Sequence, residues 1–292
     1  MPHILDGKKI AQNLKDQLKI EIENIKIKSN RVPGLAVIQV GDVAASSVYV
    51  KAKTKAAKEV GIDVIDHHLE ESTNQNDLIN LINQLNNNDD VNGILVQLPL
   101  PKTINEEVVL NSIAPEKDAD GFHPLNVGKL SISQKSDESL MIPCTPYGCL
   151  LLLRELNINL AGKNAVVIGR SNIVGKPMAQ LLLKESCTVT TVHSKTINIK
   201  GICKNADILI AAIGKPEFVN KDWVKEGAII IDVGINRIKI NEEKSKLVGD
   251  VLFSDVENKV SAISPVPGGV GPMTIACLLR NTTAACKLKY IN

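Results

Sequence analysis

Short, continuous runs of branched apolar residues alternate along this chain with segments expected to be helical, and this alternation restricts the possible folds. Residues 35–41 and 93–98 are apolar runs of the kind that form strands buried on both faces of a sheet. Residues 46–60 and 76–86 are expected to form helices, and residues 63–69 a further strand. Because strands and helices take turns, the sequence predicts parallel sheets in an α/β fold.

The alternation occurs in two blocks separated by the polar stretch at residues 131–139, near which we place a domain boundary. A length of 292 residues fits about two domains. A helix is expected at residues 8–28, where apolar side chains recur every three or four positions. The second block is expected to contain the strands 165–169, 188–193, 206–213 and 228–234 and the helix 176–184.

Composition excludes several classes of function. Aromatic residues make up only 2% of the chain, too few for a surface that stacks single-stranded nucleic acid. A net charge of +2, spread along the chain, provides no strong field for DNA or an anionic membrane. The N-terminal residues resemble no targeting segment and no apolar run could span a bilayer, so we expect a soluble protein. Six cysteines without a CxxC pair indicate reduced thiols and a cytoplasmic location.

A glycine-containing turn between an expected strand and an expected helix indicates a nucleotide site in the second block. The turn runs from Gly169 to Gly175, and Pro177 suits the first turn of the helix. At such a helix start, free backbone N–H groups and the helix dipole stabilise a pyrophosphate. The spacing differs from GxGxxG, and a P-loop fits poorly because Pro177 replaces the magnesium-binding Ser or Thr. A tight turn without a ligand is the alternative.

The residues at the end of the next strand favour NADP over NAD. NAD-binding units place a carboxylate there to bind the ribose 2′-hydroxyl, whereas residues 193–196 contain none. A hydroxyl such as that of Ser194, beside a cation, would instead bind a 2′-phosphate. Arg170 can offer the same phosphate a planar pair of donors, unless it is only a solvated surface charge.

In the first block, Tyr49 and Lys53 lie one helical turn apart and therefore share a helix face. A lysine that acts as a base must be neutral part of the time, and lowering its pKa from about 10.4 towards 7 takes roughly 4 kcal/mol. Tyr49 could orient the ammonium group, or its ring could simply cover the lysine stem. The Tyr-x-x-x-Lys pair also occurs in short-chain dehydrogenases, where it follows the dinucleotide unit; here it precedes the glycine turn.

Further elements of the first block could meet that helix. Gln97 ends a buried strand, and ligands of parallel sheets gather at the carboxyl ends of strands. Asp118 and Asp120 belong to a turn-like run without metal-spaced partners, so we expect no metal site. His67 and His68 are expected to be ordinary strand residues.

A loop dense in Gly and Pro, residues 264–274, lies near the C-terminus. Such a loop brings bare backbone close to a ligand, or it is a tight connection and nothing more. Residues 274–285 are expected to form a closing helix.

Together these motifs resemble the bifunctional methylenetetrahydrofolate dehydrogenase/cyclohydrolase family, and the resemblance covers essentially the whole chain. It rests on six segments in the family's order: 49–53, 93–101, 115–122, 143–146, 169–175 and 265–274. The family implies a folate-binding catalytic domain at residues 1–138, to which residues 268–292 return, and a Rossmann-type NADP-binding domain at residues 139–267. It implies NADP-dependent oxidation of 5,10-methylenetetrahydrofolate to the methenyl cation, then hydrolysis to 10-formyltetrahydrofolate.

The resemblance also implies roles for single residues. Lys53 would be the central catalytic residue of the hydrolysis, Tyr49 would orient it and stack on the folate, and Gln97 would tune it. Asp120 would be the fourth catalytic residue and hold the donors of the pterin ring. The residues expected to bind substrate are Tyr49, Lys53, Val96, Gln97, Leu98, Asp120, Pro267, Gly268, Gly271, Pro272 and Thr274. Those expected to contact NADP are Gly169, Arg170, Ser171, Ser194 and Ile235.

Two other functions stay open at this point. A short-chain oxidoreductase using Tyr49 and Lys53 would turn over simple alcohols without folate. A non-catalytic NADP-sensing module would bind the cofactor without oxidising methylenetetrahydrofolate. The family further suggests a homodimer formed through the second domain, with tetrahydrofolate one-carbon derivatives as substrates and neither nucleic acid nor a membrane as a partner.

Overall fold

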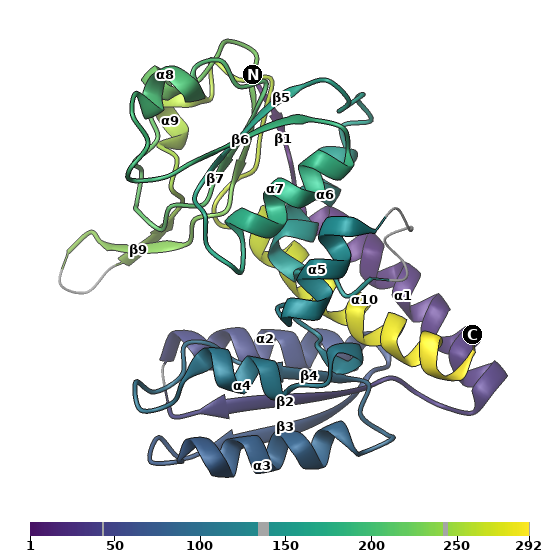
Figure 1. Cartoon of the computed structure of the whole chain (residues 1–292). Coiled ribbons are helices and arrows are strands. Elements are labelled where there is room, and N and C mark those ends of the chain that lie inside the picture. The colour runs from purple at the N-terminus through teal and green to yellow at the C-terminus, as the bar shows by residue number, and fades with distance from the viewer. Residues whose placement is uncertain (43, 134–139, 242–244, 292) are drawn as a thin grey trace. The chain divides into compact units, whose positions relative to one another are not determined.

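Two parallel sheets, one of three strands and one of six, organise the residues that the structure describes, which are 1–42, 44–133, 140–241 and 245–291 (Figure 1). The structure is a computed structural model. The chain divides into two compact units, each built around one of these sheets. The three-strand unit comprises Gln12–Cys144 and Ile275–Asn292, and the six-strand unit comprises Met1–Ala11 and Thr145–Thr274.

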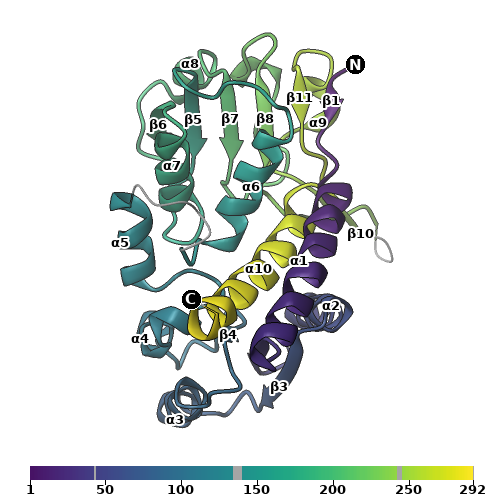
Figure 2. The ribbon, with the colours of Figure 1, turned by 90° about the vertical axis from the view of Figure 1, so that its right-hand side faces the viewer.

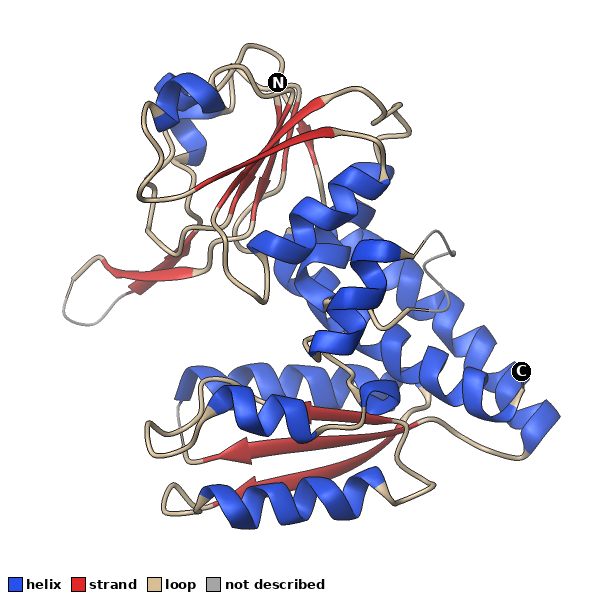
Figure 3. Cartoon of the chain, in the orientation of Figure 1, coloured by secondary structure: helices blue, strands red, loops and turns tan. Residues whose placement is uncertain are grey.

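The sheet of the three-strand unit has the order β3-β2-β4, and its strands are parallel. The central strand β2 (Gly34–Val40) is buried along its whole length. It is flanked by β3 (Asp63–Leu69) and β4 (Gly93–Val96). The connecting helices α2 (Ala44–Val60) and α3 (Gln75–Asn86) cover opposite faces of the sheet, as Figure 3 shows.

Apolar side chains form the core between this sheet and α3. Ile38 and Val40 of β2 pack in one cluster with Leu78 and Ile82 of α3 and with Ile94 of β4. The core holds the carboxyl ends of β2 and β4 in a fixed place because both strands contribute side chains to it. That edge of the sheet carries one of the candidate site residues.

Helices complete the three-strand unit. Its short helices are α4 (Glu106–Ser112), a 3₁₀ turn at Pro115–Lys117, and α5 (Pro124–Ile132). The long helices α1 (Gly7–Ser29) and α10 (Val270–Tyr290) lie side by side in both views (Figures 1 and 2), and Lys287 Nζ pairs with Glu21 Oε1 at 2.8 Å. The prediction that the C-terminal helix returns to the first domain is confirmed.

The six-strand unit contains a parallel sheet in the order β1-β11-β8-β7-β5-β6, which Figure 2 shows face-on. Its strands are β1 (His3–Ile4), β11 (Ala262–Ile263), β8 (Ile229–Asp232), β7 (Ile208–Ala211), β5 (Asn164–Ile168) and β6 (Thr188–Val192). Because β5 lies between β6 and β7, the order of the strands reverses there, as it does in doubly wound nucleotide-binding sheets.

Short helices and one antiparallel strand pair surround this sheet. The helices are α6 (Cys144–Arg154), α7 (Gly175–Lys184), α8 (Ile199–Cys203), a 3₁₀ turn at Lys221–Trp223, and α9 (Phe253–Val256). The antiparallel pair is β9 (Asn236–Lys239) and β10 (Ser245–Val248).

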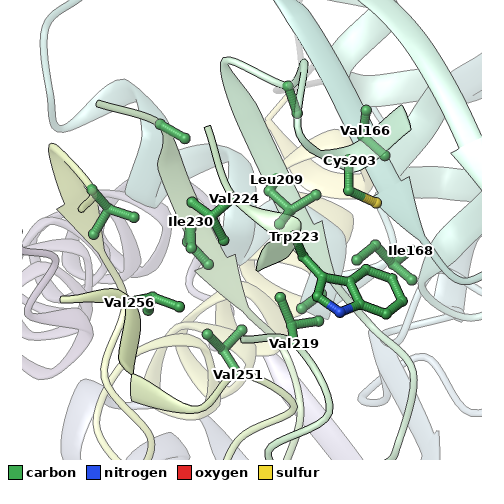
Figure 4. Packing of buried hydrophobic residues seen from close by; sticks show 14 of the residues in the cluster. Val166, Ile168, Cys203, Leu209, Val219, Trp223, Val224, Ile230, Val251 and Val256 are labelled. Atoms are coloured by element: carbon green, nitrogen blue, oxygen red, sulfur yellow. The ribbon is translucent and has the colours of Figure 1, made fainter. Parts of the chain in front are cut away.

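The tryptophan of the chain fills the core on one side of the six-stranded sheet. Trp223 is 4% exposed and lies among Ile168, Leu209 and Val219 (Figure 4). The ring of Phe218 meets it edge to face, with centroids 5.2 Å apart. Truncating a buried tryptophan typically costs about 3–5 kcal/mol, so this ring is a main support of the strands β5 and β7.

The two-domain α/β architecture predicted from the sequence is confirmed. Each strand expected from the sequence matches an observed strand to within two residues at either end. The closing helix is longer than expected, since α10 spans Val270–Tyr290 instead of residues 274–285. None of the helices in the described part of the chain is long and apolar enough to cross a membrane.

The limits of the two units differ from the domain limits expected from the sequence. The expected boundary between residues 138 and 139 lies outside the described residues. Residues 1–11 belong to the six-strand unit, because β1 pairs with β11. Residues 268–274 also belong to that unit, and the three-strand unit receives the chain from Ile275 onwards. Two-residue strands such as β1 have too little pattern to be predicted.

Candidate active site

The end of β4 and one face of α2 bring Lys53 and Gln97 together. Gln97 directly follows β4, and its N–H donates to the carbonyl of Ile38 over 2.8 Å. Lys53 lies on α2 and is only 7% exposed. Its Nζ donates to Gln97 Oε1 over 3.1 Å. Gln97 Nε2 donates in turn to the Leu98 carbonyl over 2.7 Å, which fixes the amide with its oxygen toward the lysine.

Tyr49 lies one turn before Lys53 on α2 and is half-buried. Burial raises the pKa of its phenol, so the hydroxyl stays protonated at neutral pH. The helix therefore presents an aromatic ring with a neutral hydroxyl one turn from a buried ammonium group.

Asp118 builds the turn that carries Asp120. The buried Asp118 carboxylate accepts the N–H of Gly121 at 3.0 Å and the N–H of His123 at 2.8 Å. It also accepts Asn126 Nδ2 at 2.9 Å. These donors hold the Asp118 carboxylate inside the turn, whereas the neighbouring Asp120 is only half-buried. The two carboxyl groups of the motif thus have different tasks.

Asp120 and Lys53 influence each other electrostatically. Burial raises the pKa of Asp120 to about 6, the Lys53 ammonium opposes this rise, and the Asp118 carboxylate adds to it. A carboxyl group of this pKa is ionised at neutral pH but can take up a proton under mildly acidic conditions. Lys53, Gln97 and Asp120 therefore share one neighbourhood in the three-strand unit.

Two other residues expected to bind substrate pack against the core. Val96 is 1% exposed and belongs to the apolar cluster between the sheet and α3. Leu98 is half-buried against the same cluster. The Val96 side chain is thus unavailable to a ligand, and only the backbone of this residue could contact one.

The glycine- and proline-rich loop expected to line the substrate site belongs to the six-strand unit. Gly268 has a φ of +111°, a value that favours glycine. Pro272 lies in the first turn of α10, and Thr274 Oγ1 donates to the Val270 carbonyl over 3.2 Å. A Cβ added to Gly271 would lie 3.7 Å from Ile235 Cδ1, so this loop adjoins a residue expected to contact the cofactor.

Within this loop, the peptide bond between Val266 and Pro267 is cis. Gly269 N–H donates to the Pro265 carbonyl over 2.8 Å and closes the loop on itself. The backbone of this segment is therefore held by its own contacts.

The turn between β5 and α7 requires glycine at both ends. A Cβ at Gly169, where φ is +130°, would lie 2.2 Å from the carbonyl oxygen of Ala212. A Cβ at Gly175 would lie 2.3 Å from the Gly169 oxygen. The sequence predicts free N–H groups at the start of α7, but the Ser171 hydroxyl accepts those of Val174 and Gly175 at 3.2 and 3.3 Å. Ser171 precedes the helix, so its side chain binds N–H groups three and four positions later in the turn.

Arg170 and Ser194 follow neighbouring strands at the same edge of the sheet. The last residues of these strands, Ile168 of β5 and Val192 of β6, are paired in register. Both Arg170 and Ser194 are exposed. A guanidinium group and a hydroxyl group thus follow two adjacent strands, at the carboxyl ends of the sheet where nucleotides bind.

Both parts of the chain match models of one protein family. Residues 5–120 match the catalytic domain of tetrahydrofolate dehydrogenase/cyclohydrolase, and residues 143–290 match its NAD(P)-binding domain. The chain belongs to the tetrahydrofolate dehydrogenase/cyclohydrolase family. The resemblance inferred from the six motifs is confirmed.

Relatives in this family match the chain over nearly its whole length. Bifunctional protein FolD of Acetivibrio thermocellus is 54% identical over 286 residues, which are 98% of this chain and 97% of that protein. Bifunctional protein FolD of Campylobacter concisus is 55% identical over 286 residues, 98% of each.

Solved structures of the family have the same fold. The bifunctional enzyme FolD from Campylobacter jejuni is similar with a TM-score of 0.93 at 48% identity, over 99% of this chain and 100% of that one. FolD from Trypanosoma brucei, in complex with NADP and an inhibitor, has a TM-score of 0.94 at 37% identity, over 100% and 99%.

The sequence motifs gave no sign of a residue on α10 that holds the Asp120 turn. Asn281 is fully buried, and its Nδ2 donates to the carbonyls of Ala119 at 3.0 Å and Ile142 at 2.8 Å. The signal in the sequence is a polar run, residues 280–283, between the apolar residues 275–279 and 284–286 of this helix; all four polar side chains are buried. The motifs also gave no sign of Asp232 and Asp250, two buried carboxyl groups of the six-strand unit.

Metal ligands do not gather in the described ranges: no group of three or more His, Cys, Asp or Glu side chains there could hold an ion. His68 Nε2 lies 3.2 Å from Asp42 Oδ1, and both side chains are exposed. The two histidines of β3 lie on the edge strand of the three-stranded sheet.

Proposed function

We propose that this member of the tetrahydrofolate dehydrogenase/cyclohydrolase family oxidises 5,10-methylenetetrahydrofolate with NADP and hydrolyses the methenyl product to 10-formyltetrahydrofolate. The observation that carries the proposal is the buried Lys53 ammonium, held by Gln97 Oε1 at 3.1 Å and coupled to the Asp120 carboxyl. The relatives named bifunctional protein FolD, at 54% and 55% identity, support the pair of activities.

The hydrolysis needs a group that accepts a proton from water. Water that adds to the cationic methenyl carbon loses a proton, and the neutral form of Lys53 would accept it. Gln97 holds Nζ through an uncharged oxygen, so it orients the lysine without the strong preference for the ammonium form that a carboxylate would impose. Tyr49 offers a ring on which a flat pterin can stack, and Asp120 can accept hydrogen bonds from pterin N–H groups.

The six-strand unit supports a dinucleotide site. Gly169 and Gly175 leave the two ends of the β5–α7 turn without a Cβ atom, which allows a close approach of backbone to a phosphate there. Gly169, Arg170 and Ser171 would hold the phosphates. When bound, NADP supplies the hydride acceptor, and the contribution of the protein is to position it against the substrate.

Ser194 and Ile235 would also contact this cofactor. The residues at the same edge of the sheet support NADP over NAD. Ser194 follows β6, residues 193–196 contain no carboxylate, and Ile235 follows β8. The Trypanosoma brucei structure, a complex with NADP, supports the same preference.

The remaining parts of the proposal concern the state of the protein in the cell. The six cysteines are buried and include no CxxC pair, which supports a reducing compartment, the cytoplasm. We further infer a homodimer formed through the NADP-binding domain, which the mass of the protein in solution would test.

One spectrophotometric assay tests the function. Methylenetetrahydrofolate is added with NADP and then with NAD, and the formation of reduced cofactor and of the methenyl compound is followed separately. We expect turnover with NADP, weaker turnover with NAD, and decay of added methenyltetrahydrofolate above its spontaneous rate. Cofactor binding without any absorbance change would instead identify a non-catalytic NADP-sensing module, and turnover of simple alcohols alone would identify a short-chain oxidoreductase.

A further inference from the structure

A fully buried carboxylate of the six-strand unit holds three consecutive backbone N–H groups. Asp250 Oδ2 accepts the N–H of Ile213 at 2.5 Å and of Gly214 at 2.9 Å, and Oδ1 accepts the N–H of Lys215 at 3.0 Å. Asn236 Nδ2 donates to Oδ1 at 2.9 Å. Successive N–H groups of this kind form a concave anion site, and here a carboxylate of the chain itself occupies it.

The segments held by Asp250 lie at the carboxyl ends of two neighbouring strands. Ile213–Lys215 follow β7, and Asn236 comes after β8 and directly after Ile235. Ala212, the residue directly before the first of these segments, lies against the β5–α7 turn, since its carbonyl oxygen limits the space at Gly169. Asp250 therefore connects chain segments along the edge where a dinucleotide would lie.

A second carboxyl group fixes Asp250 in turn. Asp232, the last residue of β8, accepts the N–H groups of Asp250 at 2.9 Å and Val251 at 3.0 Å. Burial, together with the Asp250 charge, raises the pKa of Asp232 to about 7, so the two acids need not be charged together. Glycines make room for both: a Cβ at Gly234 would lie 2.3 Å from Asp250 Oδ1, and one at Gly249 1.8 Å from Asp232 Oδ2.

The strand order indicates which half of the cofactor would bind at the carboxyl ends of β7 and β8. In a doubly wound sheet the dinucleotide crosses the point where the order reverses, with its adenosine side at the second strand and its pyrophosphate at the first turn. Here the second strand is β6, which precedes Ser194, and the first turn follows β5. The nicotinamide half then falls on the opposite side, at β7 and β8.

We propose that Asp250 is a positioning residue for the nicotinamide half of NADP, because it sets the backbone of residues 213–215 and the place of Asn236. This inference rests on the proposed NADP-dependent function. The Asp250 carboxylate itself is fully buried and does not touch the cofactor; it acts through the segments that it holds.

The test compares two ligands that differ by the nicotinamide half. In Asp250→Asn, an NH₂ group replaces one of the two carboxylate oxygens and faces backbone N–H donors. Asn236→Ala is a milder change, because it removes only one of the four groups that donate to Asp250. Because unmet buried hydrogen bonds would let the backbone of residues 213–215 move, we expect the Kd for NADP to rise about ten-fold in Asp250→Asn and less in Asn236→Ala. The Kd for adenosine 2′,5′-bisphosphate should stay within about two-fold of the wild-type value.

A matched control lies at the opposite edge of the same sheet. Asp207 accepts the N–H of Asn164 at 2.9 Å and pairs with Lys225 before β7 begins. Asp207→Asn should lower the melting temperature without changing either Kd. The cyclohydrolase rate with added methenyltetrahydrofolate provides a second readout, because it needs no cofactor; it should stay close to wild type in Asp207→Asn.

The outcomes separate the inference from the proposed function. Equal weakening of NADP and of the bisphosphate in Asp250→Asn would show a general loss of structure and overturn the inference, as would unchanged binding of both. A wild-type protein that binds NADP but does not oxidise methylenetetrahydrofolate would refute the proposed function, while the binding comparison would still decide the role of Asp250.

Discussion

The Lys53 ammonium donates to Gln97 Oε1 over 3.1 Å, and the Gln97 amide is locked in that orientation by the Leu98 carbonyl. An amide oxygen is a weaker partner for an ammonium group than a carboxylate. Gln97 therefore holds the lysine in place through an uncharged oxygen. Such an arrangement is what the role proposed for Lys53, acceptance of a proton from water, would use.

Replacing Lys53 tests its role directly. Lys53→Ala removes the proton acceptor, and we expect the cyclohydrolase rate to fall at least about 100-fold, because general base catalysis contributes that much or more. Lys55→Ala is the matched control, since Lys55 lies on the same helix with a side chain that is 80% exposed. The rate is followed by the loss of methenyltetrahydrofolate absorbance. Normal turnover in Lys53→Ala would refute the role of the lysine.

Gln97→Glu tests the argument about the amide. A carboxylate beside Lys53 favours the ammonium form, and a close opposite charge commonly shifts a pKa by about 1–3 units. We expect the rising limb of the cyclohydrolase pH–rate profile to move to higher pH by about one unit or more. Gln17→Glu, an exposed change on α1, should leave the profile in place. An unmoved profile in Gln97→Glu would mean that Lys53 is not the titrating group.

The sheets could be predicted from the sequence because buried parallel strands need continuous apolar runs. Residues 93–98 form such a run and correspond to β4. The meeting of Lys53 and Gln97 could be expected only in outline: the two residues are 44 positions apart, and parallel topology brings them to one edge. The orientation of the Gln97 amide depends on the Leu98 carbonyl, which no sequence pattern reveals.

Polar side chains that find partners far along the chain were beyond prediction. Asn281 supports the Asp120 turn through Ala119, which is 162 positions away. Asp250 holds Ile213 across 37 positions. The sequence around Asn281 and around Asp250 contains no local pattern that predicts the hydrogen-bond partner of either residue. The free N–H groups predicted at the start of α7 were wrong for a similar reason, since the Ser171 side chain occupies two of them.

Arg170→Ala tests the choice of cofactor. The exposed guanidinium group is expected to bind the 2′-phosphate, and charge-assisted hydrogen bonds contribute about 1.5–3 kcal/mol each. The KM for NADP should rise about ten-fold or more, with little change for NAD, in the dehydrogenase assay. Lys204→Ala, an exposed cation after α8, is the control. Equal increases for NADP and NAD would remove Arg170 from the 2′-phosphate site.

Gly169→Ala and Gly162→Ala form a matched pair within the six-strand unit. Both glycines have positive φ, but a Cβ at Gly169 would lie 2.2 Å from the Ala212 oxygen, whereas Gly162 has no atom within 4 Å of that position. Gly162→Ala should cost roughly 1–2 kcal/mol of unfolding free energy, the cost of the left-handed conformation. Gly169→Ala should cost about 3 kcal/mol or more, because overpacking adds to it. Similar urea midpoints for the two variants would contradict this account.

The raised pKa of Asp120 predicts that this carboxyl group weakens the fold at neutral pH. Its pKa is about 6 in the folded chain, against 3.8 for an ordinary aspartate, mainly because of burial. The folded state therefore binds the Asp120 proton more tightly than the unfolded state. The free energy of unfolding contributed by this carboxyl group is highest at low pH and falls as the pH rises from about 4 to about 6. Above pH 6 the penalty is constant, at most about 3 kcal/mol.

Asp120→Asn removes this penalty. The variant should be more stable than wild type by up to about 3 kcal/mol at pH 8 and nearly equal to it at pH 4, as measured by urea unfolding at several pH values. Asp207→Asn should change stability in the opposite direction at pH 8, since a hydrogen bond from Lys225 lowers the pKa of Asp207 and stabilises its charged form. Asp120→Asn should also lose activity, because the carboxylate that destabilises the fold is the one expected to hold the pterin. A pH-independent stability difference between Asp120→Asn and wild type would show that the carboxyl group is not strained by burial.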